Sequence, residues 1–258
     1  MLDLKDKWIL ITGASSGIGK ACAQRFAASG MNLIITARRQ DKLDQIAKEL
    51  KAQHEVEIEV FCFDVRKSEE VKSFSLALQE KNITPFILIN NAGLAAGRTK
   101  IQEGSLEDWE QMIDTNVKGL LYITRNILPM MIEANEGQII NIGSTAGHVI
   151  YPQGNVYNAT KFAVKALNEA INLDLVDTNI KVCSIDPGAC DTDFSLVRFK
   201  GDKATAEKVY EGYEPLHAND IAEAAFFVCT RPVHVNIQNM IIYPTAQRSV
   251  YVHRKSVS

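Results

Sequence analysis

The sequence has no long apolar run, no paired cysteine motif and no excess of positive charge. Its apolar stretches fall short of the ~18 residues that cross a bilayer, and its first residues mix charges among apolar ones without a cleavable leader. The five cysteines are scattered, odd in number and free of C-x-x-C spacing, which argues against a disulfide framework or a zinc site. We therefore expect a cytoplasmic protein with reduced thiols, no bound metal and no membrane partner.

Proline is scarce and the net charge is small. The 258 residues include 7 Pro, with 46% hydrophobic and 23% charged residues, a composition that excludes disordered, collagenous and low-complexity chains. The formal net charge is -3, and basic residues such as the pair Arg38-Arg39 form no extended cluster, so we expect no nucleic-acid partner. Because no Pro/Gly/Ser-rich linker divides the chain, we predict a single domain over residues 1–258.

Short apolar runs rich in β-branched residues alternate with longer stretches of helical spacing along almost the whole chain. Parallel strands need crossover connections, and the crossover helices cover both faces of the sheet. The pattern predicts a doubly wound, Rossmann-type α/β fold, with a parallel sheet of about seven strands and helices on both faces. The predicted strands are residues 7–11, 32–36, 56–61, 86–90, 138–142, 181–185 and 238–243.

Polar residues mark the starts of several predicted helices. Ser68, Ser105 and Asn155 each precede a helical pattern, because such residues can cap the first free N–H groups of a helix. The pattern after Ser105 runs to Asn116, and the one after Asn155 runs to about Asp177.

The least regular stretch of the chain begins at Pro187 and extends to Gly201. It lies between a predicted strand and the next helical segment, and it is too long for a minimal turn. Connections of this length in a compact domain are commonly functional loops or lids. We expect residues of about 187–214 to form a loop at the substrate site.

A glycine-rich turn follows the first predicted strand. The segment from Thr12 to Gly19 reads T-G-A-S-S-G-I-G and is followed by a helical pattern. In such a strand–turn–helix, glycines let the backbone approach a pyrophosphate, and the N–H groups at the helix N-terminus stabilise its charge. The spacing G-x-x-x-G-x-G differs from the G-x-G-x-x-G fingerprint, so a tight turn without a ligand is the alternative. Its position between the first strand and the first helix favours a dinucleotide site.

The end of the second predicted strand indicates which dinucleotide binds. A carboxylate there would bind the ribose 2′-hydroxyl of NAD, but the chain reads Thr36-Ala37-Arg38-Arg39. A guanidinium is a charged, forked donor that suits a 2′-phosphate. We predict NADP as the cofactor. The alternative is that both arginines are solvated surface charges.

Tyr157 and Lys161 stand four residues apart in a predicted helix, so their side chains emerge on one face. An adjacent ammonium stabilises a phenolate and lowers the pKa of a phenol from about 10, which makes tyrosine a usable proton donor and acceptor. Ser144 follows a predicted strand and can face this helix. The same spacing recurs at Tyr251 and Lys255, but no serine at a strand end precedes that pair, and we interpret it as a chance match.

These residues occur, together with others, in an order and spacing that resembles the short-chain dehydrogenase/reductase family across about residues 5–245. One departure is Cys190, where the family more often has an aliphatic residue. The matched blocks are T-G-A-S-S-G-I-G at 12–19, D-V at 64–65, N-N-A-G at 90–93, N-V at 116–117, Ser144, Y-N-A-T-K at 157–161 and P-G-A-C-D-T at 187–192.

The resemblance implies four catalytic residues. Ser144 is expected to hydrogen-bond the substrate oxygen, and Tyr157 to pass the proton while the nicotinamide passes the hydride. Asn116 is expected to hold a water that links Lys161 to solvent. For Asn116 the alternative is a local hydrogen-bonding role near a helix end.

The resemblance also extends the set of expected cofactor contacts beyond the glycine-rich turn and the two arginines. The adenine is expected beside residues 64 and 65, and the nicotinamide beside residues 187, 188 and 192. The full expected set is Gly13, Ser15, Ser16, Gly17, Ile18, Gly19, Arg38, Arg39, Asp64, Val65, Asn91, Ala92, Gly93, Tyr157, Lys161, Pro187, Gly188 and Thr192.

The segment 192–202 and the residues after the last strand, Pro244-Thr245-Ala246-Gln247, look like the branch of the family that oxidises serine, allo-threonine and other short 3-hydroxy acids such as 3-hydroxypropionate. A guanidinium on a closing loop can bind a substrate carboxylate bidentately, and Arg198 is the candidate. The alternative for Arg198 is a solvated or acid-paired loop residue. Ketoacyl reductases of the family usually end in an Asp-Gly-Gly type close, which this chain lacks.

Other functions and an assembly state stay open at this point. A broad-specificity carbonyl or 3-ketoacyl reductase is the enzymatic alternative, and a non-catalytic NADP-binding scaffold is the alternative from a different class. The resemblance also implies a homotetramer packed through the helices near 108–134 and 155–177, while the sequence shows only that both segments carry much apolar surface.

Overall fold

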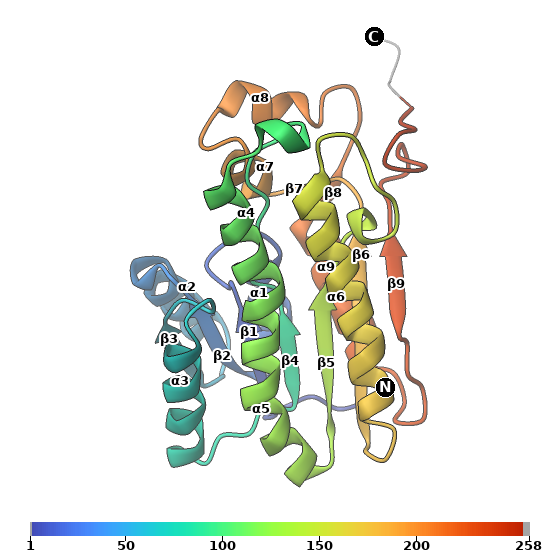
Figure 1. The fold of residues 1–258 in the computed structure, drawn as a ribbon. Coiled ribbons are helices and arrows are strands. Elements are labelled where there is room, and N and C mark those ends of the chain that lie inside the picture. The colour runs from blue at the N-terminus through green and yellow to red at the C-terminus, as the bar shows by residue number, and fades with distance from the viewer. Residues whose placement is uncertain (1, 255–258) are drawn as a thin grey trace.

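A seven-stranded parallel sheet runs through the centre of the structure, a computed structural model that describes residues 2–254 (Figure 1). All seven predicted strands are confirmed, each to within two residues of its expected ends. The predicted domain 1–258 also includes residues 1 and 255–258, which lie outside the described residues. The strands are, in spatial order, β3 (Ile58–Cys62), β2 (Asn32–Ala37), β1 (Trp8–Thr12), β4 (Ile87–Asn90), β5 (Gly137–Ile142), β6 (Ile180–Pro187) and β9 (Asn239–Ile242).

The five inner strands read mostly as apolar runs because both of their faces are buried, whereas the edge strands β3 and β9 are partly exposed. In β1, Ile9 and Ile11 belong to the hydrophobic cluster on one face, and Leu10 between them belongs to the cluster on the other face. None of the three side chains has any solvent-exposed area. The alternation of side chains along a strand therefore builds two cores from one apolar sequence.

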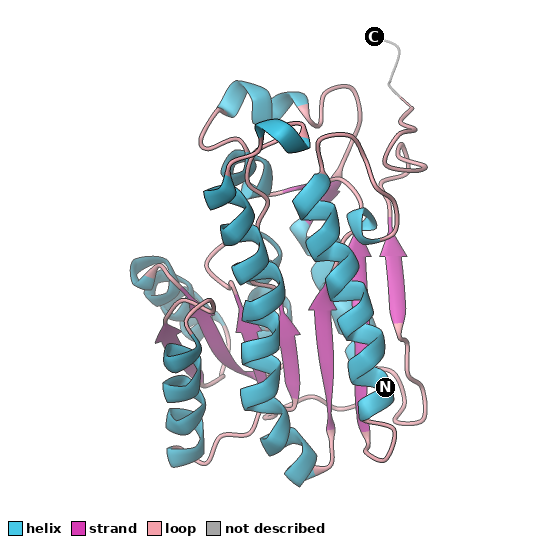
Figure 2. Ribbon diagram, viewed as in Figure 1, coloured by secondary structure: helices cyan, strands magenta, loops and turns pink. Residues whose placement is uncertain are grey.

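Helices cover both faces of the sheet, which confirms the doubly wound class (Figure 2). The helices α1 (Gly17–Ala27), α2 (Gln40–Gln53) and α9 (Ala218–Cys229) contribute to the core on one face. The helices α3 (Ser68–Glu80), α5 (Leu120–Ala134) and α6 (Asn155–Asp174) pack on the other. Among residues 2–254, none of the helices combines the length and the apolar character that a bilayer crossing requires.

The predicted helix starts are only partly correct. Ser105 caps α4 (Leu106–Ile113) as predicted, since its hydroxyl accepts a hydrogen bond from the Asp108 N–H at 3.3 Å. Ser68 and Asn155 do not precede their helices but are the first helical residues, after Lys67 and Gly154. Side-chain capping is therefore a less exact marker than the apolar spacing that follows it.

The helix predicted to run to Asn116 is wrong at its C-terminal end. The α-helix α4 ends at Ile113, and a π-helical turn over Asp114–Gly119 connects it to α5. A π-turn carries one more residue per hydrogen-bonded ring than an α-helix, and apolar spacing does not register this insertion. The turn buries Asn116, which is 2% exposed.

The carboxyl ends of the strands form the functional end of the fold. From β1 the chain moves to β2 and β3 on one side, and then to β4, β5, β6 and β9 on the other. In doubly wound folds, ligands bind outside the carboxyl ends of the strands at such a switch point.

The stretch predicted to be irregular is partly regular. It contains β7 (Cys190–Asp191) and the short helices α7 (Asp193–Arg198) and α8 (Lys203–Lys208). The strand β7 pairs with β8 (Leu216–His217) in a separate two-stranded sheet. In Figure 1 this segment, drawn in orange, lies at the carboxyl end of the main sheet.

Candidate active site

A cleft of about 800 Å³ opens at the carboxyl ends of the strands. Two of the predicted site residues, Gly19 and Asn116, do not line it. Every other one does: Gly13, Ser15, Ser16, Gly17, Ile18, Arg38, Arg39, Asp64, Val65, Asn91, Ala92, Gly93, Ser144, Tyr157, Lys161, Pro187, Gly188, Thr192 and Arg198.

The turn between β1 and α1 requires glycine at three positions. Gly13 and Gly17 have φ angles of +66° and +53°, a region that L side chains rarely adopt. Gly19 has no room for a side chain, because a Cβ there would lie 2.5 Å from the Gly13 carbonyl oxygen and from Asn91 Nδ2. The turn therefore presents bare backbone and the N-terminus of an 11-residue helix to the cleft, which fits a dinucleotide pyrophosphate.

The side chain of Asn91 fixes this turn from the adjacent strand. Its Nδ2 donates to the carbonyls of Thr12 and Gly13 at 2.9 and 3.2 Å, and Thr12 Oγ1 accepts from the N–H groups of Asn91 and Ala92. The amide of Asn91 is thus engaged by the protein. Asn91 therefore supports a cofactor site by holding the glycine-rich turn in its shape.

The two arginines after β2 lie at the outer end of the cleft and are exposed. Arg39 donates from Nη2 to Ser15 Oγ and Ser16 Oγ, at 2.9 and 3.0 Å, which brings a guanidinium against the glycine-rich turn. The pKa of Asp64 lies below its usual value. Partial burial raises it, but the hydrogen bonds from Arg66 and the charges of Arg66 and Arg38 together lower it by more, so the carboxyl stays ionised. This end of the cleft therefore carries an excess of fixed positive charge.

Ser144, Tyr157 and Lys161 come together from two elements at the other end of the cleft. Ser144 follows β5 and caps the 3₁₀ turn Thr145–Gly147, while the other two lie one turn apart on α6. Tyr157 is 7% exposed, and the Ser144 side chain lowers the pKa of its phenol. Lys161 is 8% exposed, and its Nζ donates to the Ile142 carbonyl at 2.9 Å.

Lys161 by itself does not lower the pKa of Tyr157, and the predicted lowering by Lys161 together with the nicotinamide stays a prediction. Burial raises the pKa of Tyr157 well above its usual value, and the groups that lower it are Ser144 and Arg198. Lys161 Nζ lies 6.0 Å from the centre of the Tyr157 ring and is bound to a carbonyl instead. Burial also lowers the pKa of Lys161, to about 8. The phenol is therefore held neutral, as a proton donor must be.

Asn116 is buried behind the cleft and makes local hydrogen bonds. Its Oδ1 accepts from the Leu94 N–H, and its Nδ2 donates to the Leu94 carbonyl at 2.8 Å and to Thr160 Oγ1 at 3.0 Å. These bonds join the π-turn to α6, which carries Tyr157 and Lys161. The predicted water between Asn116 and Lys161 stays a prediction.

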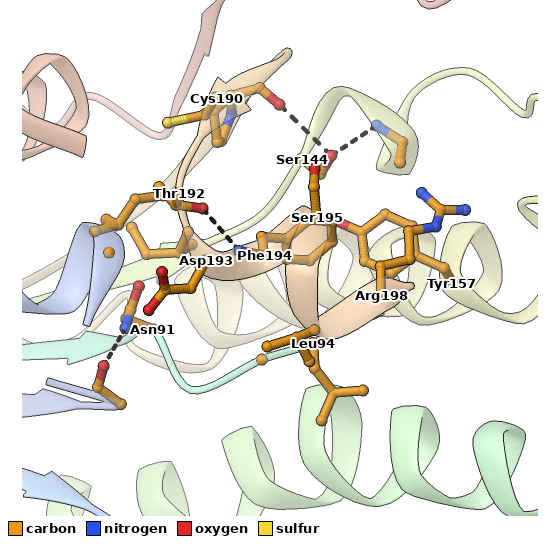
Figure 3. Close-up of a pocket in the computed structure, with 18 of the residues that line it drawn as sticks. Asn91, Leu94, Ser144, Tyr157, Cys190, Thr192, Asp193, Phe194, Ser195 and Arg198 are labelled. Atoms are coloured by element: carbon orange, nitrogen blue, oxygen red, sulfur yellow. Dashed lines mark hydrogen bonds between the residues drawn. The ribbon is translucent and has the colours of Figure 1, made fainter. Parts of the chain in front are cut away.

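Arg198 lies beside Tyr157 in the cleft. Its guanidinium carbon is 5.6 Å from the centre of the Tyr157 ring, and Nη1 donates to the Tyr151 hydroxyl at 2.9 Å. Arg198 is also bound twice to Gly97, through Nε to the carbonyl and through its own carbonyl to the Gly97 N–H. Figure 3 shows Ser144, Tyr157 and Arg198 gathered in one part of the pocket and Asn91 in another.

The comparison with known protein families agrees with this geometry. Residues 7–202 match the family described as short chain dehydrogenase. The chain belongs to the short-chain dehydrogenase family.

Several short-chain dehydrogenases and reductases are similar to this chain over nearly its whole length. The NADP-dependent 3-hydroxy acid dehydrogenase YdfG of Escherichia coli (strain K12) is 42% identical over 250 residues, which cover 96% of this chain and 99% of the relative. A sulfoacetaldehyde reductase of Chromohalobacter salexigens is 42% identical over 240 residues, covering 93% and 94%. The structure described as the closed form of serine dehydrogenase complexed with NADP+ has 42% identity and a TM-score of 0.90, covering 96% and 100%.

Some residues of this short-chain dehydrogenase site escaped the sequence analysis. Tyr151 binds Arg198, and the Phe194 ring lies 5.5 Å from the Tyr157 ring, centre to centre. Tyr151 stands in an irregular segment and Phe194 in a six-residue helix, α7, and neither segment is long enough for apolar spacing to carry a signal. Tyr251, interpreted as half of a chance pair, donates to the Ile150 carbonyl, and Lys255 lies outside the described residues. Within the described part of the chain, no group of three or more His, Cys, Asp and Glu is arranged to hold a metal ion.

Proposed function

We propose that this chain is an NADP-dependent oxidoreductase that transfers a hydride between the nicotinamide and the hydroxyl or carbonyl carbon of a short 3-hydroxy acid, such as serine, allo-threonine or 3-hydroxypropionate. The observation that carries the proposal is the convergence of a neutral phenol, a serine hydroxyl and a guanidinium in one pocket, at Tyr157, Ser144 and Arg198. The names of the relatives support the reaction and the cofactor.

The protein's own groups handle the proton and the orientation of the substrate. In reduction, Tyr157 donates its phenolic proton to the carbonyl oxygen, and Ser144 donates a hydrogen bond to the same oxygen. Lys161, as an ammonium, supplies positive charge that favours the resulting phenolate. Bound NADP supplies the hydride donor or acceptor, and the oxidation of a hydroxyl reverses these steps.

Arg198 gives the site its selectivity for acids. A guanidinium binds a carboxylate or a sulfonate through two parallel N–H···O bonds, and Tyr151 and Gly97 hold this one beside the phenol. The relatives named as a 3-hydroxy acid dehydrogenase and a sulfoacetaldehyde reductase both act on a short molecule with an acidic group. We assign α7 and α8, within residues 187–214, to the segment that closes over the substrate.

A substrate panel tests the function. Purified protein is assayed with L-serine, L-allo-threonine, 3-hydroxypropionate and sulfoacetaldehyde, and with uncharged alcohols and ketones, using NAD and NADP in parallel. We expect the largest kcat/KM for a short 3-hydroxy acid with NADP. Turnover of uncharged ketones alone would assign a broad carbonyl reductase, and dinucleotide binding without any turnover would assign a non-catalytic scaffold.

The cofactor preference depends on the two arginines after β2. Replacing Arg38 and Arg39 together by Ala removes the donors assigned to the 2′-phosphate. Charge-assisted hydrogen bonds contribute about 1.5–3 kcal/mol, so the KM for NADP is expected to rise about 10- to 100-fold. The KM for NAD should stay within about twofold, because NAD has no 2′-phosphate. Lys42→Ala, an exposed cation on α2 outside the cleft, is the matched control. An equal loss for both dinucleotides would contradict the assignment.

We also assign the protein to the cytoplasm and to a homotetramer. All five cysteines are free, as expected of a reducing compartment. Large apolar side chains are exposed on α5 and α6, namely Leu121, Ile132, Phe162 and Leu173. Exposed apolar residues on two helices of one face of the sheet favour burial against another subunit.

A further inference from the structure

A buried carboxylate lies next to the catalytic residues without belonging to them. Asp186 stands one residue before the end of β6 and is 1% exposed. Its Oδ2 lies 2.6 Å from His148 Nε2 and accepts from Asn239 Nδ2 at 2.5 Å, while its Oδ1 accepts from Ser184 Oγ at 2.5 Å. Burial of a charge is costly unless hydrogen bonds compensate it, and here three side chains do so.

The carboxylate packs against the backbone that carries Ser144. Gly143 connects Ile142, whose carbonyl binds Lys161, to Ser144. A Cβ on Gly143 would lie 1.8 Å from Asp186 Oδ1, so the carboxylate touches this backbone directly. The Gly143 N–H donates to the Ile185 carbonyl at 2.9 Å, which ties the same turn to β6. Asp186 therefore contacts the segment 142–144, which carries Ser144 and the carbonyl that binds Lys161.

The charge of Asp186 also acts on Lys161. The ammonium is buried against a neutral carbonyl, and burial lowers its pKa to about 8, while the Asp186 charge opposes this effect and raises it. The titratable groups that face the pair are His148 beside Asp186, Tyr157 on the same helix as Lys161, and Cys183 on β6. Burial and the Asp186 charge both raise the pKa of the Cys183 thiol to about 12, so it stays neutral.

We propose that Asp186 is a positioning residue of the reaction. It holds the turn from Ile142 to Ser144 in place, and its negative charge keeps Lys161 in the ammonium form. His148 is bound to the same carboxylate through Nε2. The role in turnover rests on the proposed function, whereas the effect on Lys161 charge does not.

Two neutral variants and one charged variant test this inference. Asp186→Asn keeps the size of the side chain and removes the charge, Asp186→Ser provides a smaller neutral side chain, and Asp186→Glu retains the charge. Without the opposing charge, burial lowers the Lys161 pKa further, by about 1 unit for the loss of one nearby opposite charge. The alkaline limb of the kcat/KM profile for reduction should then move to lower pH by the same amount, because reduction needs the ammonium.

A second readout needs no substrate. Protein with ¹³Cε-labelled lysine is titrated by NMR, and the Lys161 signal is assigned by its loss in Lys161→Met. We expect the Lys161 titration midpoint to fall in Asp186→Asn and Asp186→Ser and to stay within about 0.3 units of the wild type in Asp186→Glu. His148→Gln retains the Asp186 charge and is the matched control, with an unmoved midpoint.

The outcomes separate the two proposals. A midpoint unchanged in a folded neutral variant would overturn the role of Asp186, even if the enzyme oxidises 3-hydroxy acids. A loss of activity that is equal in Asp186→Asn and Asp186→Glu, with both midpoints unmoved, would reduce Asp186 to a packing role. Failure of the wild type on every substrate would overturn the proposed function and leave the NMR test of Asp186 standing.

Discussion

Replacement of Tyr157 by Phe is expected to lower kcat by about 10²- to 10⁴-fold, the usual contribution of a positioned proton donor. The variant loses only the phenolic hydroxyl, and the buried ring keeps its contact with Phe194. Dinucleotide affinity should therefore stay within about twofold. The measurements are the NADP-dependent absorbance change under saturating substrate and the dissociation constant of NADPH from fluorescence.

The control for this variant is Tyr210→Phe, which removes another half-buried phenol that lines the same cleft and bonds to Ser195. Its kcat is expected to change by less than about tenfold, since its hydroxyl makes contacts within the closing segment only. Wild-type kcat in Tyr157→Phe would end the assignment of the proton donor. Loss of NADPH binding in parallel would show damage to the cleft instead.

Replacement of Arg198 by Ala is expected to raise the KM for a short 3-hydroxy acid at least about tenfold, which corresponds to about 1.4 kcal/mol of lost carboxylate binding. The KM for NADP should be unchanged, because the guanidinium lies at the Tyr157 end of the cleft. The KM for an uncharged ketone should also be unchanged. Steady-state kinetics with the acid and the ketone in parallel separate recognition of the acid from general damage.

Two further variants sharpen the test. Arg198→Lys keeps the charge without the forked geometry and should recover only part of the loss. Lys200 stands two residues from Arg198, and its ammonium pairs with Asp108 at 3.0 Å outside the main cleft. Lys200→Ala should therefore leave the KM for the acid near the wild-type value. An unchanged KM in Arg198→Ala would refute the assignment.

The sheet was predictable because its five inner strands are buried on both faces and the apolar runs are bounded by polar segments. Many of the predicted cleft residues follow from this, since they stand at strand ends that must meet at one edge of a parallel sheet, whereas Tyr157, Lys161 and Arg198 stand on helices. The π-turn over Asp114–Gly119 and the two short helices at 193–208 were not predictable. The π-turn differs from an α-helix by one extra residue per hydrogen-bonded ring, which apolar spacing does not reveal. The two helices have six residues each and are too short for a periodic signal.

The charge states of the site were the hardest feature to predict. The spacing of Tyr157 and Lys161 correctly indicates a common helix face, yet it contains no information on burial, which decides both pKa values. The residue that opposes the effect of burial on Lys161, Asp186, is distant in sequence and stands on another strand. Long-range electrostatics of this kind requires the three-dimensional arrangement.

The two bonds between Arg198 and Gly97 have a kinetic consequence. One uses the main chain of Arg198 and the other its guanidinium, so α7 cannot move away from Gly97 without displacing the group assigned to the substrate acid. If Arg198 binds the acid as proposed, we expect release of the product and loss of its bond to the guanidinium to occur in one step. A bound acid that loses its bond to the guanidinium would then be released to the solvent by the same movement of α7.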